Sequence, residues 1–477
     1  MTTRTRFAPS PTGFLHVGGI RTALFAFLVA RQADGQFILR LEDTDKVREV
    51  VGSREHLIAS LKALHLDYDE GPDIGGPHGP YIQSQRLEHY HQWAQKLIDT
   101  GRAYADPYTP EQIQAFRDAA QAEKRAFRYR DHRPDNPPAW DGTTPLRFKA
   151  EPKSYTYHDE VMGDVTTSPE VVDDFILIKS DGYPTYNFAH IIDDAEMNIT
   201  HVIRGQEFIS SMPNYLALYE ALGLPRPIFA HLPHIMNEQG NKKLGKRDGA
   251  KDVLDYIRDG YLPEALDSFI ATMGWNDGTE QETFTMNELI TKFSLDRVQR
   301  SGARFDEKRL LWTNGQFIRS LALDDLAERV NDFWPDSAAG ADEEYRRRVL
   351  ALAQDRLKTL RDLGGFSYFF AEPEINMELI DGNKQLKKLS EHERRELLET
   401  AQRELAMLTD WTPELVQTRL NELLEITGQK PGILFSLIRI AITWAPFSPQ
   451  LSDTLALLGR ERTLVRLERG ITAFSAA

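Results

Sequence analysis

The chain has 477 residues, a length that fits about three domains of roughly 150 residues each. Hydrophobic residues make up 41% of it and charged residues 27%, which is typical of a globular protein and not of a membrane-spanning one. The N-terminus lacks the apolar core of a signal peptide, so a cytoplasmic protein is expected. A net charge of −15 argues against sequence-blind coating of nucleic acid, although a local basic track stays possible.

Cysteine is absent, which excludes disulfides and any zinc site built on thiolates. Histidines do not suggest a metal site either. His231 and His234 are three residues apart, but Pro233 lies between them in an apolar stretch. A structural role is predicted for this pair, and no metal-ligand residue is expected.

The first forty-five residues predict a strand, a turn, a helix and a second strand. Residues 5–7 form the first strand, and the glycines of residues 13–19 indicate a turn. Apolar residues then recur at helical spacing over 20–28, and residues 37–41 read as a strand followed by the acidic segment 42–45. A βαβ start of this kind favours a parallel sheet.

Further along the chain, strand and helix signals alternate. Residues 71–80 are rich in glycine and proline and predict a loop, and Thr109 with Pro110 and Gln112 predicts a capped helix start. Strands are predicted at residues 171–178 and 200–204, as the second half of the same sheet. A helix closed by Gly223 follows them.

After about residue 320 the strand signal disappears and the chain reads as helical. A charged amphipathic helix is predicted over residues 346–363. Ser390 with Glu393 forms a capping box, and Thr412 and Pro431 mark two more helix starts.

The first segment that suggests chemistry is Phe7-Ala-Pro-Ser-Pro-Thr-Gly-Phe-Leu-His16-Val-Gly18-Gly19. Backbone N–H groups at the start of a helix favour a phosphate, and glycines let the backbone approach it closely. His16 can donate a hydrogen bond to a phosphate oxygen as charge develops. Taken alone, the segment is more often an ordinary turn with a surface histidine.

The second segment is Lys242-Lys243-Leu-Gly245-Lys246-Arg-Asp-Gly249. Four cations within six positions, together with two glycines, can stabilise a triphosphate and a departing pyrophosphate. The alternative for this segment alone is a solvated basic turn.

Together the two segments resemble the signature motifs of class I aminoacyl-tRNA synthetases, one at the N-terminus and one about 225 residues later. Other stretches are similar to glutamyl-tRNA synthetases in particular. They are residues 6–13, 41–45, 69–73, 79–86, 180–186, 201–205, 261–266 and 274–275. The resemblance covers residues 4–320, and the remainder resembles the helical anticodon-binding domain of bacterial members.

The resemblance implies an α/β fold: a Rossmann-type parallel-sheet catalytic domain with an inserted acceptor-binding domain, followed by an all-helical anticodon-binding region. The expected divisions are residues 1–84 and 171–240 for the two catalytic halves, 85–170 for the acceptor-stem insertion, 241–320 for a stem-contact region and 321–477 for the anticodon-binding domain.

The implied reaction is activation of glutamate by ATP and transfer to tRNA(Glu). The catalytic residues would be His16, Lys243 and Lys246, and these with Gly18, Gly19 and Glu207 would bind ATP. Mg²⁺ would help the three catalytic residues to stabilise the charge on the phosphates. Arg6, Ser10, Glu42, Tyr186, His190 and Arg204 would bind glutamate. The guanidinium groups would grip its side-chain carboxylate and Glu42 its ammonium. Glutamine would leave the cationic clamp unpaired. Arg356 would read the third anticodon base, which implies an enzyme that rejects tRNA(Gln).

The sequence also departs from the family pattern. Gly19 stands where the class has a second histidine, and Gly245 stands where serine is usual, which removes one hydroxyl donor. The cysteines that hold zinc after the Gly101-Arg-Ala-Tyr104 segment in many relatives are missing, so no zinc is expected. The family implies a monomer without membrane contact. The alternatives are a glutaminyl-tRNA synthetase, a shortened paralogue that modifies a tRNA base, and a catalytically silent tRNA-binding protein.

Overall fold

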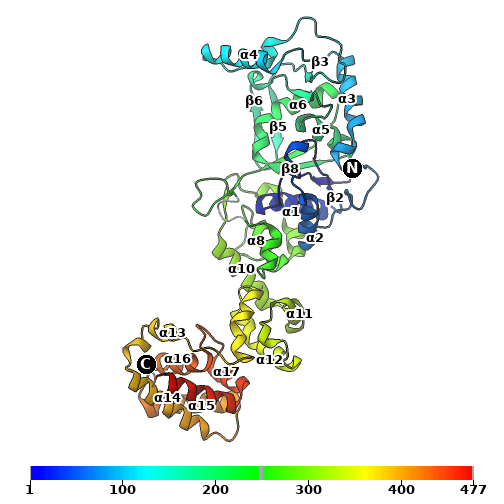
Figure 1. The fold of residues 1–477 in the computed structure, drawn as a ribbon. Helices are drawn as coiled ribbons and strands as arrows, with labels where there is room; N and C mark the ends of the chain where they lie inside the picture. Colours follow the sequence, from blue (N-terminus) through cyan, green and yellow to red (C-terminus); the bar gives the residue numbers. More distant parts are fainter. Residues whose placement is uncertain (1, 246–250, 475–477) are drawn as a thin grey trace. The chain divides into compact units, whose positions relative to one another are not determined.

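The computed structural model describes residues 2–245 and 251–474. Two compact units make up the chain. The first comprises the residues up to Tyr256 together with Pro263–Arg309, and the second comprises Ile257–Leu262 together with the residues from Leu310 onward. Strands and helices mix in the first unit, whereas the second is built from helices (Figure 1).

A six-stranded sheet forms the centre of the first unit. Its order is β2 (Gln36–Leu39), β1 (Arg4–Phe7), β8 (His201–Gly205), β9 (Ile228–Leu232), β5 (Tyr155–Asp159) and β6 (Gly163–Thr167). The first five strands run parallel to their neighbours, and β6 returns antiparallel to β5. The predicted parallel sheet and its βαβ start are therefore confirmed.

Helix α1 (Val17–Gln32) connects β1 to β2 and buries its apolar face, with Ile20, Leu24 and Leu28 fully inaccessible. The helix begins earlier than the sequence predicted, because the predicted turn extended to residue 19. His16 explains the difference: its Nδ1 accepts a hydrogen bond from the Gly18 backbone N–H at 3.1 Å and so caps the first turn.

Eight further α-helices precede residue 300 in the described chain. They are α2 (Ser53–Ala63), α3 (Leu87–Asp99), α4 (Pro110–Ala122), α5 (Tyr186–Glu196), α6 (Met212–Leu222), α7 (Val253–Arg258), α8 (Pro263–Ala271) and α9 (Met286–Lys292). The capping box predicted at Thr109 is present, and Gly223, with a φ of 65°, ends α6 as predicted.

Two smaller sheets complete the first unit. β3 (Ala103–Ala105), β4 (Leu146–Phe148) and β7 (Ile176–Ile178) form an antiparallel sheet, and β10 (Ile235–Met236) pairs with β11 (Ala303–Arg304). The prediction that residues 171–178 return to the parallel sheet is wrong. Asp173 and Asp174 instead accept hydrogen bonds from the backbone N–H groups of Tyr129 and Ala150, so only the last three residues pair as a strand.

The second unit is helical, as predicted. Its helices are α11 (Leu323–Arg329), α12 (Glu343–Ala353), α13 (Glu378–Asp381), α14 (Glu391–Ala406), α15 (Pro413–Thr427), α16 (Pro431–Thr443), α17 (Leu451–Leu458) and α18 (Arg460–Ala473), and α10 (Glu307–Ser320) leads into them. Figure 1 shows α14 to α17 gathered in one bundle, and α14 packs on α18. The predicted caps at Ser390 and Thr412 are both present. No described helix is both long enough and apolar enough to cross a membrane.

The single helix predicted over residues 346–363 is wrong. Helix α12 ends at Ala353 and is followed by a 3₁₀ turn, Gln354–Arg356. Leu357 is extended and fully buried, and Thr359 caps a new 3₁₀ segment from Leu360. Arg356 therefore lies on a short turn and not inside a helix.

Candidate active site

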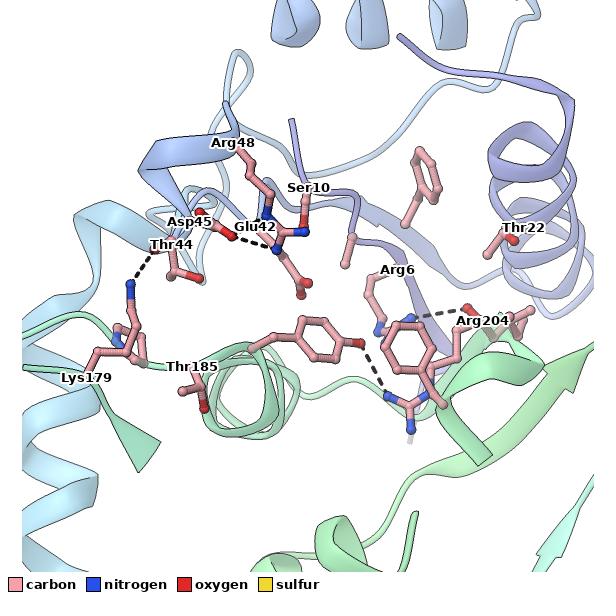
Figure 2. A pocket seen from close by; sticks show the side chains of 17 residues that line it. Arg6, Ser10, Thr22, Glu42, Thr44, Asp45, Arg48, Lys179, Thr185 and Arg204 are labelled. Carbon is pink, nitrogen blue, oxygen red and sulfur yellow. Dashed lines mark hydrogen bonds and ion pairs between the residues drawn. The ribbon is translucent and has the colours of Figure 1, made fainter. Parts of the chain in front are cut away.

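A cavity of about 630 Å³ opens where the strands of the parallel sheet end in the first unit. Its walls come from β1, β8, α1 and α5 and from the acidic segment that follows β2. Figure 2 shows the Arg6, Glu42 and Arg204 side chains pointing into this space. Ligands of open α/β sheets bind outside the carboxyl ends of the strands, so its position marks it as the candidate site.

The sequence predicted six residues around glutamate, and the structure places five of them on the cavity wall. They are Arg6, Ser10, Glu42, Tyr186 and Arg204. His190 is buried behind Arg204 and is not among the lining residues. Direct contact between His190 and a substrate stays a prediction.

Arg6 is held by a buried ion-pair network. Its Nε lies 3.1 Å from Oδ1 of Asp194, and the same oxygen accepts from Arg40 Nη1 at 2.8 Å. Arg40 also donates to Glu42 at 2.9 Å. Burial pushes the pKa of Asp194 up, but the charges of Arg6 and Arg40 outweigh it and lower that pKa to about 2. Arg6 therefore has a permanent counterion.

Arg204 is held differently, because its hydrogen-bond partners in the described chain are neutral. Its Nη1 lies 3.5 Å from the Tyr186 hydroxyl and 3.3 Å from His190 Nε2. Its Nη2 lies 3.1 Å from the Met212 sulfur, and its Nε lies 3.1 Å from His231 Nε2. Only 4% of Arg204 is exposed, and no ion pair of the described residues includes it. A buried cation without a counter-charge favours an anionic ligand.

Both histidines beside Arg204 are uncharged. His190 Nδ1 donates to the Tyr186 carbonyl at 2.8 Å, so its Nε2 lone pair faces the guanidinium. Burial and the Arg204 charge lower the pKa of His190 to about 3. The guanidinium also lies over the rings of Phe208 and Tyr215, at 4.8 and 5.0 Å from their centroids. These contacts orient the cation and leave its charge available to a ligand.

Glu42 faces the cavity as a buried carboxyl. Burial raises its pKa, and the hydrogen bond and charge of Arg40 only partly offset this, so the pKa of Glu42 lies at about 7. A carboxylate beside a cationic clamp fits the two charged ends of an amino acid.

The Glu42 pKa sets a pH dependence. Only the ionised carboxylate attracts an ammonium group, so kcat/KM for the amino acid should rise about tenfold per pH unit below pH 7 and level off above it. Steady-state kinetics between pH 5.5 and 8 would measure this. The Glu42→Gln variant should be less active and should lack this acid limb. The assignment fails if both enzymes show the same pH profile.

The predicted nucleotide-binding residues beyond β8 also meet one another. Glu207 Oε1 lies 3.6 Å from Lys243 Nζ, and Glu207 Oε2 lies 3.8 Å from His234 Nδ1. A Cβ at position 205 would come within 2.1 Å of Glu207, so Gly205 lets this carboxylate lie across the strand end. Phe208 beside it lines the cavity. Lys246 lies outside the described residues, and its role stays a prediction.

His16, Gly18 and Gly19 lie at the N-terminus of α1, whose Thr22 lines the cavity. Because His16 Nδ1 accepts the Gly18 N–H, the ring hydrogen belongs on Nε2, which can donate to a phosphate. A Cβ at position 18 would lie 3.0 Å from the His16 ring. Gly18 therefore makes room for the capping imidazole. The approach of His16 to Lys243 stays a prediction.

Arg356 is accompanied by a second arginine in the helical unit. Burial and the charge of Arg356 lower the pKa of Arg439, whose Nε donates to Ser448 Oγ at 3.0 Å. Phe447, 44% exposed, packs on Phe366 with ring centroids 5.9 Å apart. Arg439 therefore contacts the residue that follows Phe447 in the chain. Guanidinium groups and an exposed aromatic ring are the groups that suit the phosphate and base of a single-stranded nucleotide. The sequence analysis missed Arg439 and Phe447, which come from a different helix and its following loop.

Comparison with known families agrees with this geometry. Residues 2–312 match the catalytic domain of class I tRNA synthetases for E and Q, and residues 325–471 match an anticodon-binding domain. The chain belongs to the class I tRNA synthetases for glutamate and glutamine. The glutamate–tRNA ligase of Chloroflexus aurantiacus is 40% identical over 494 residues, covering 98% of this chain and 97% of the relative. That of Clostridium botulinum strain Hall is 39% identical, covering 99% of each.

Solved structures of the synthetase family give the same result. The crystal structure of a glutamate–tRNA ligase from Elizabethkingia meningosepticum, in complex with its amino acid, has a TM-score of 0.87 and 30% identity to this chain, covering 99% of it and 100% of that protein. The predicted family and its two-part fold, an α/β catalytic region with a helical anticodon-binding region, are therefore confirmed.

Proposed function

We propose that this chain joins glutamate to the 3′ end of tRNA(Glu) in two steps. The α-carboxylate of glutamate attacks the α-phosphate of ATP, which forms glutamyl-adenylate and releases pyrophosphate. A terminal ribose hydroxyl of the tRNA then attacks the activated carbonyl and releases AMP. Membership of the synthetase family supports the reaction, because residues 2–312 match its catalytic domain and the similar relatives are named glutamate–tRNA ligases.

Arg204 is the observation that carries the choice of amino acid. Its buried guanidinium has only neutral hydrogen-bond partners in the described chain, whereas Arg6 has Asp194. A glutamate side-chain carboxylate would supply the missing counter-charge and accept two parallel hydrogen bonds. The neutral amide of glutamine would leave the charge uncompensated, which supports discrimination between the two. Glu42, whose pKa of about 7 lets it ionise near neutral pH, would receive the ammonium group of glutamate.

The phosphates of ATP would lie toward the N-terminus of α1 and the segment around Lys243. His16 Nε2–H, Lys243 and Lys246 would donate to the phosphate oxygens as negative charge develops in the transition state. Glu207, now paired with Lys243, would exchange that contact for the nucleotide. The Mg²⁺ that accompanies ATP would bind mainly to phosphate oxygens, because residues 2–245 and 251–474 contain no cluster of three His, Asp or Glu suited to a metal.

The tRNA would contact both units. The segment 85–170 would bind the acceptor stem, and Arg356 with Arg439 and Phe447 would bind the anticodon. We also propose that the enzyme acts as a monomer in the cytoplasm. The division into five segments stays a prediction, and the described chain shows its main boundaries at residues 256–263 and 309–310.

Aminoacylation of purified tRNA(Glu) and tRNA(Gln), each with glutamate and with glutamine, tests the proposed function. Glutamate on tRNA(Glu) should be the favoured product. Glutamine on tRNA(Gln) would identify a glutaminyl-tRNA synthetase instead. Binding of tRNA without ATP–pyrophosphate exchange would identify a silent tRNA-binding protein.

Replacing Arg356 tests the anticodon assignment. Arg356→Gln should weaken kcat/KM for tRNA(Glu) by about 10- to 100-fold, the value of one specific contact to a base. It should also reduce the enzyme's preference for unaltered tRNA(Glu) over a tRNA(Glu) transcript that has G as its third anticodon base. Arg395→Gln is the matched control, because the Arg395 side chain on α14 is 41% exposed and its ion pair in the described chain is with Glu399. If wild type and Arg356→Gln show the same preference between the two transcripts, Arg356 does not read the third anticodon base.

A further inference from the structure

Arg204 is the end of a buried chain of three side chains from three neighbouring strands. In the parallel register of β8 and β9, Arg204 lies opposite His231, and its Nε donates to His231 Nε2 at 3.1 Å. His231 Nδ1 lies 2.5 Å from Oδ2 of Asp159, the last residue of β5. His231 is fully inaccessible and Asp159 is 1% exposed. Nothing in this arrangement faces the cavity except the guanidinium itself.

The donors and acceptors of this chain allow one arrangement of hydrogens. Oδ1 of Asp159 accepts the backbone N–H groups of Val161, Met162 and His231 at 3.1, 2.9 and 3.2 Å, which fixes the carboxylate. Oδ2 then accepts the hydrogen on His231 Nδ1. The Nε2 atom is left with its lone pair toward Arg204, which always donates.

The electrostatics agree with this assignment. Burial alone would raise the pKa of Asp159, but hydrogen bonds from His231 and the Met162 backbone hold it below its ordinary value. Burial lowers the pKa of His231, although the hydrogen bond and the charge of Asp159 act in the opposite direction. Asp159 is thus ionised and His231 neutral at neutral pH, with the negative charge one imidazole ring away from Arg204.

We propose that Asp159 and His231 are positioning residues for substrate selection: together they fix the Arg204 guanidinium toward the amino-acid side chain through a neutral acceptor. A carboxylate in direct contact with Arg204 would orient it equally well but would neutralise it. The imidazole of His231, which lies between Asp159 and Arg204, orients the guanidinium and preserves its charge for the glutamate carboxylate. This inference rests on the proposed function of Arg204 and adds two residues that do not touch the substrate.

The tautomer provides a sharp test, the Asp159→Asn variant. The asparagine oxygen must accept the three backbone N–H groups, so its NH₂ faces His231 Nδ1 and donates to it. The ring hydrogen then moves to Nε2, where it opposes the Arg204 Nε–H and displaces the guanidinium. We expect KM for glutamate to rise about 10- to 100-fold, as small misplacements of a clamp do, with KM for ATP within about threefold of wild type. The preference for glutamate over glutamine should fall in proportion.

Asp164→Asn is the matched control, because Asp164 makes the same carboxylate-to-Nδ1 contact with His158 at 2.7 Å on the same β5–β6 hairpin, but both side chains are exposed. His231→Gln should stay within about fivefold of wild type, since its amide can still accept from Arg204 and donate to Asp159. His231→Phe, which cannot, should behave like Asp159→Asn. The two His231 variants keep the test decisive if Asp159→Asn does not fold.

Kinetics of ATP–pyrophosphate exchange with tRNA(Glu) present, and the melting temperature of each variant, separate the outcomes. A selective rise in KM for glutamate in Asp159→Asn or His231→Phe, with Asp164→Asn unchanged, supports the relay. An unchanged KM for glutamate overturns it, and so does a parallel rise in both KM values with a lower melting temperature, which indicates a structural role. If wild type does not charge tRNA(Glu), the proposed function itself fails.

Discussion

The Arg204→Gln variant should lose most of its kcat/KM for glutamate. Removing one partner of a buried, hydrogen-bonded charge pair costs about 2–5 kcal/mol, or roughly 30- to 4,000-fold. The reason is specific to this arginine: its partners Tyr186, His190 and His231 are neutral, so the proposed glutamate carboxylate would be its counter-charge. Steady-state aminoacylation of tRNA(Glu) at varied glutamate concentration measures the loss.

Two further enzymes make the Arg204 result interpretable. Arg204→Lys keeps the charge but loses the planar fork, so it should fall between wild type and Arg204→Gln. Arg226→Gln, at an exposed arginine just before β9, should resemble wild type. In Arg204→Gln, glutamine should compete better than in wild type. If kcat/KM for glutamate and kcat/KM for glutamine fall by the same factor, the charge on Arg204 does not select the substrate.

Much of this site could be predicted from sequence because its residues lie beside turn and strand signals. Arg6 is the second-last residue of β1, Glu42 follows β2, and Arg204 is the second-last residue of β8. The carboxyl ends of parallel strands converge, so local patterns were enough to bring these side chains to one cavity.

The supporting residues could not be predicted in this way. Asp194 lies in a helix that also carries Asp193 and Glu196, so it does not stand out there. Arg40 follows a buried strand, and Asp159 ends a strand that pairs with the parallel sheet far along the chain. Their importance comes from pairing across 72 to 188 residues of chain, which no local periodicity encodes. The one signal available was a charged residue in an apolar context, since buried charges need partners.

The same reasoning explains the two errors in secondary structure. Apolar residues at 171–178 predicted a strand of the parallel sheet, but Asp173 and Asp174 use their carboxylates on distant backbone N–H groups. Over residues 346–363, helical periodicity continued past a break where Leu357 is buried in extended conformation and Thr359 starts a new cap. In both cases side-chain to backbone bonds overrode the pattern.

Asp194→Asn should destabilise the catalytic unit by about 3–5 kcal/mol, the cost of breaking a buried ion pair from one side. Asp194 accepts from Arg6 and Arg40 at 3.1 and 2.8 Å, and the neutral amide would leave both cations undercompensated. Calorimetry should show a lower melting temperature for the α/β unit. Asp118→Asn, exposed on α4 beside Gln114, should stay within about 0.5 kcal/mol of wild type.

The pH dependence of stability gives an independent check on Asp194, because its pKa is lowered to about 2 in the folded protein. A carboxyl with a lowered pKa stabilises the fold above its unfolded value, near 4, and this stabilisation disappears as pH falls toward 2. Wild type should therefore lose stability steeply in acid, and Asp194→Asn should lose less, starting from a lower plateau. Equal melting temperatures for wild type and Asp194→Asn at pH 7 would show that Arg6 and Arg40 find another counter-charge. In that case Asp194 would not be the residue that fixes Arg6 in the cavity wall.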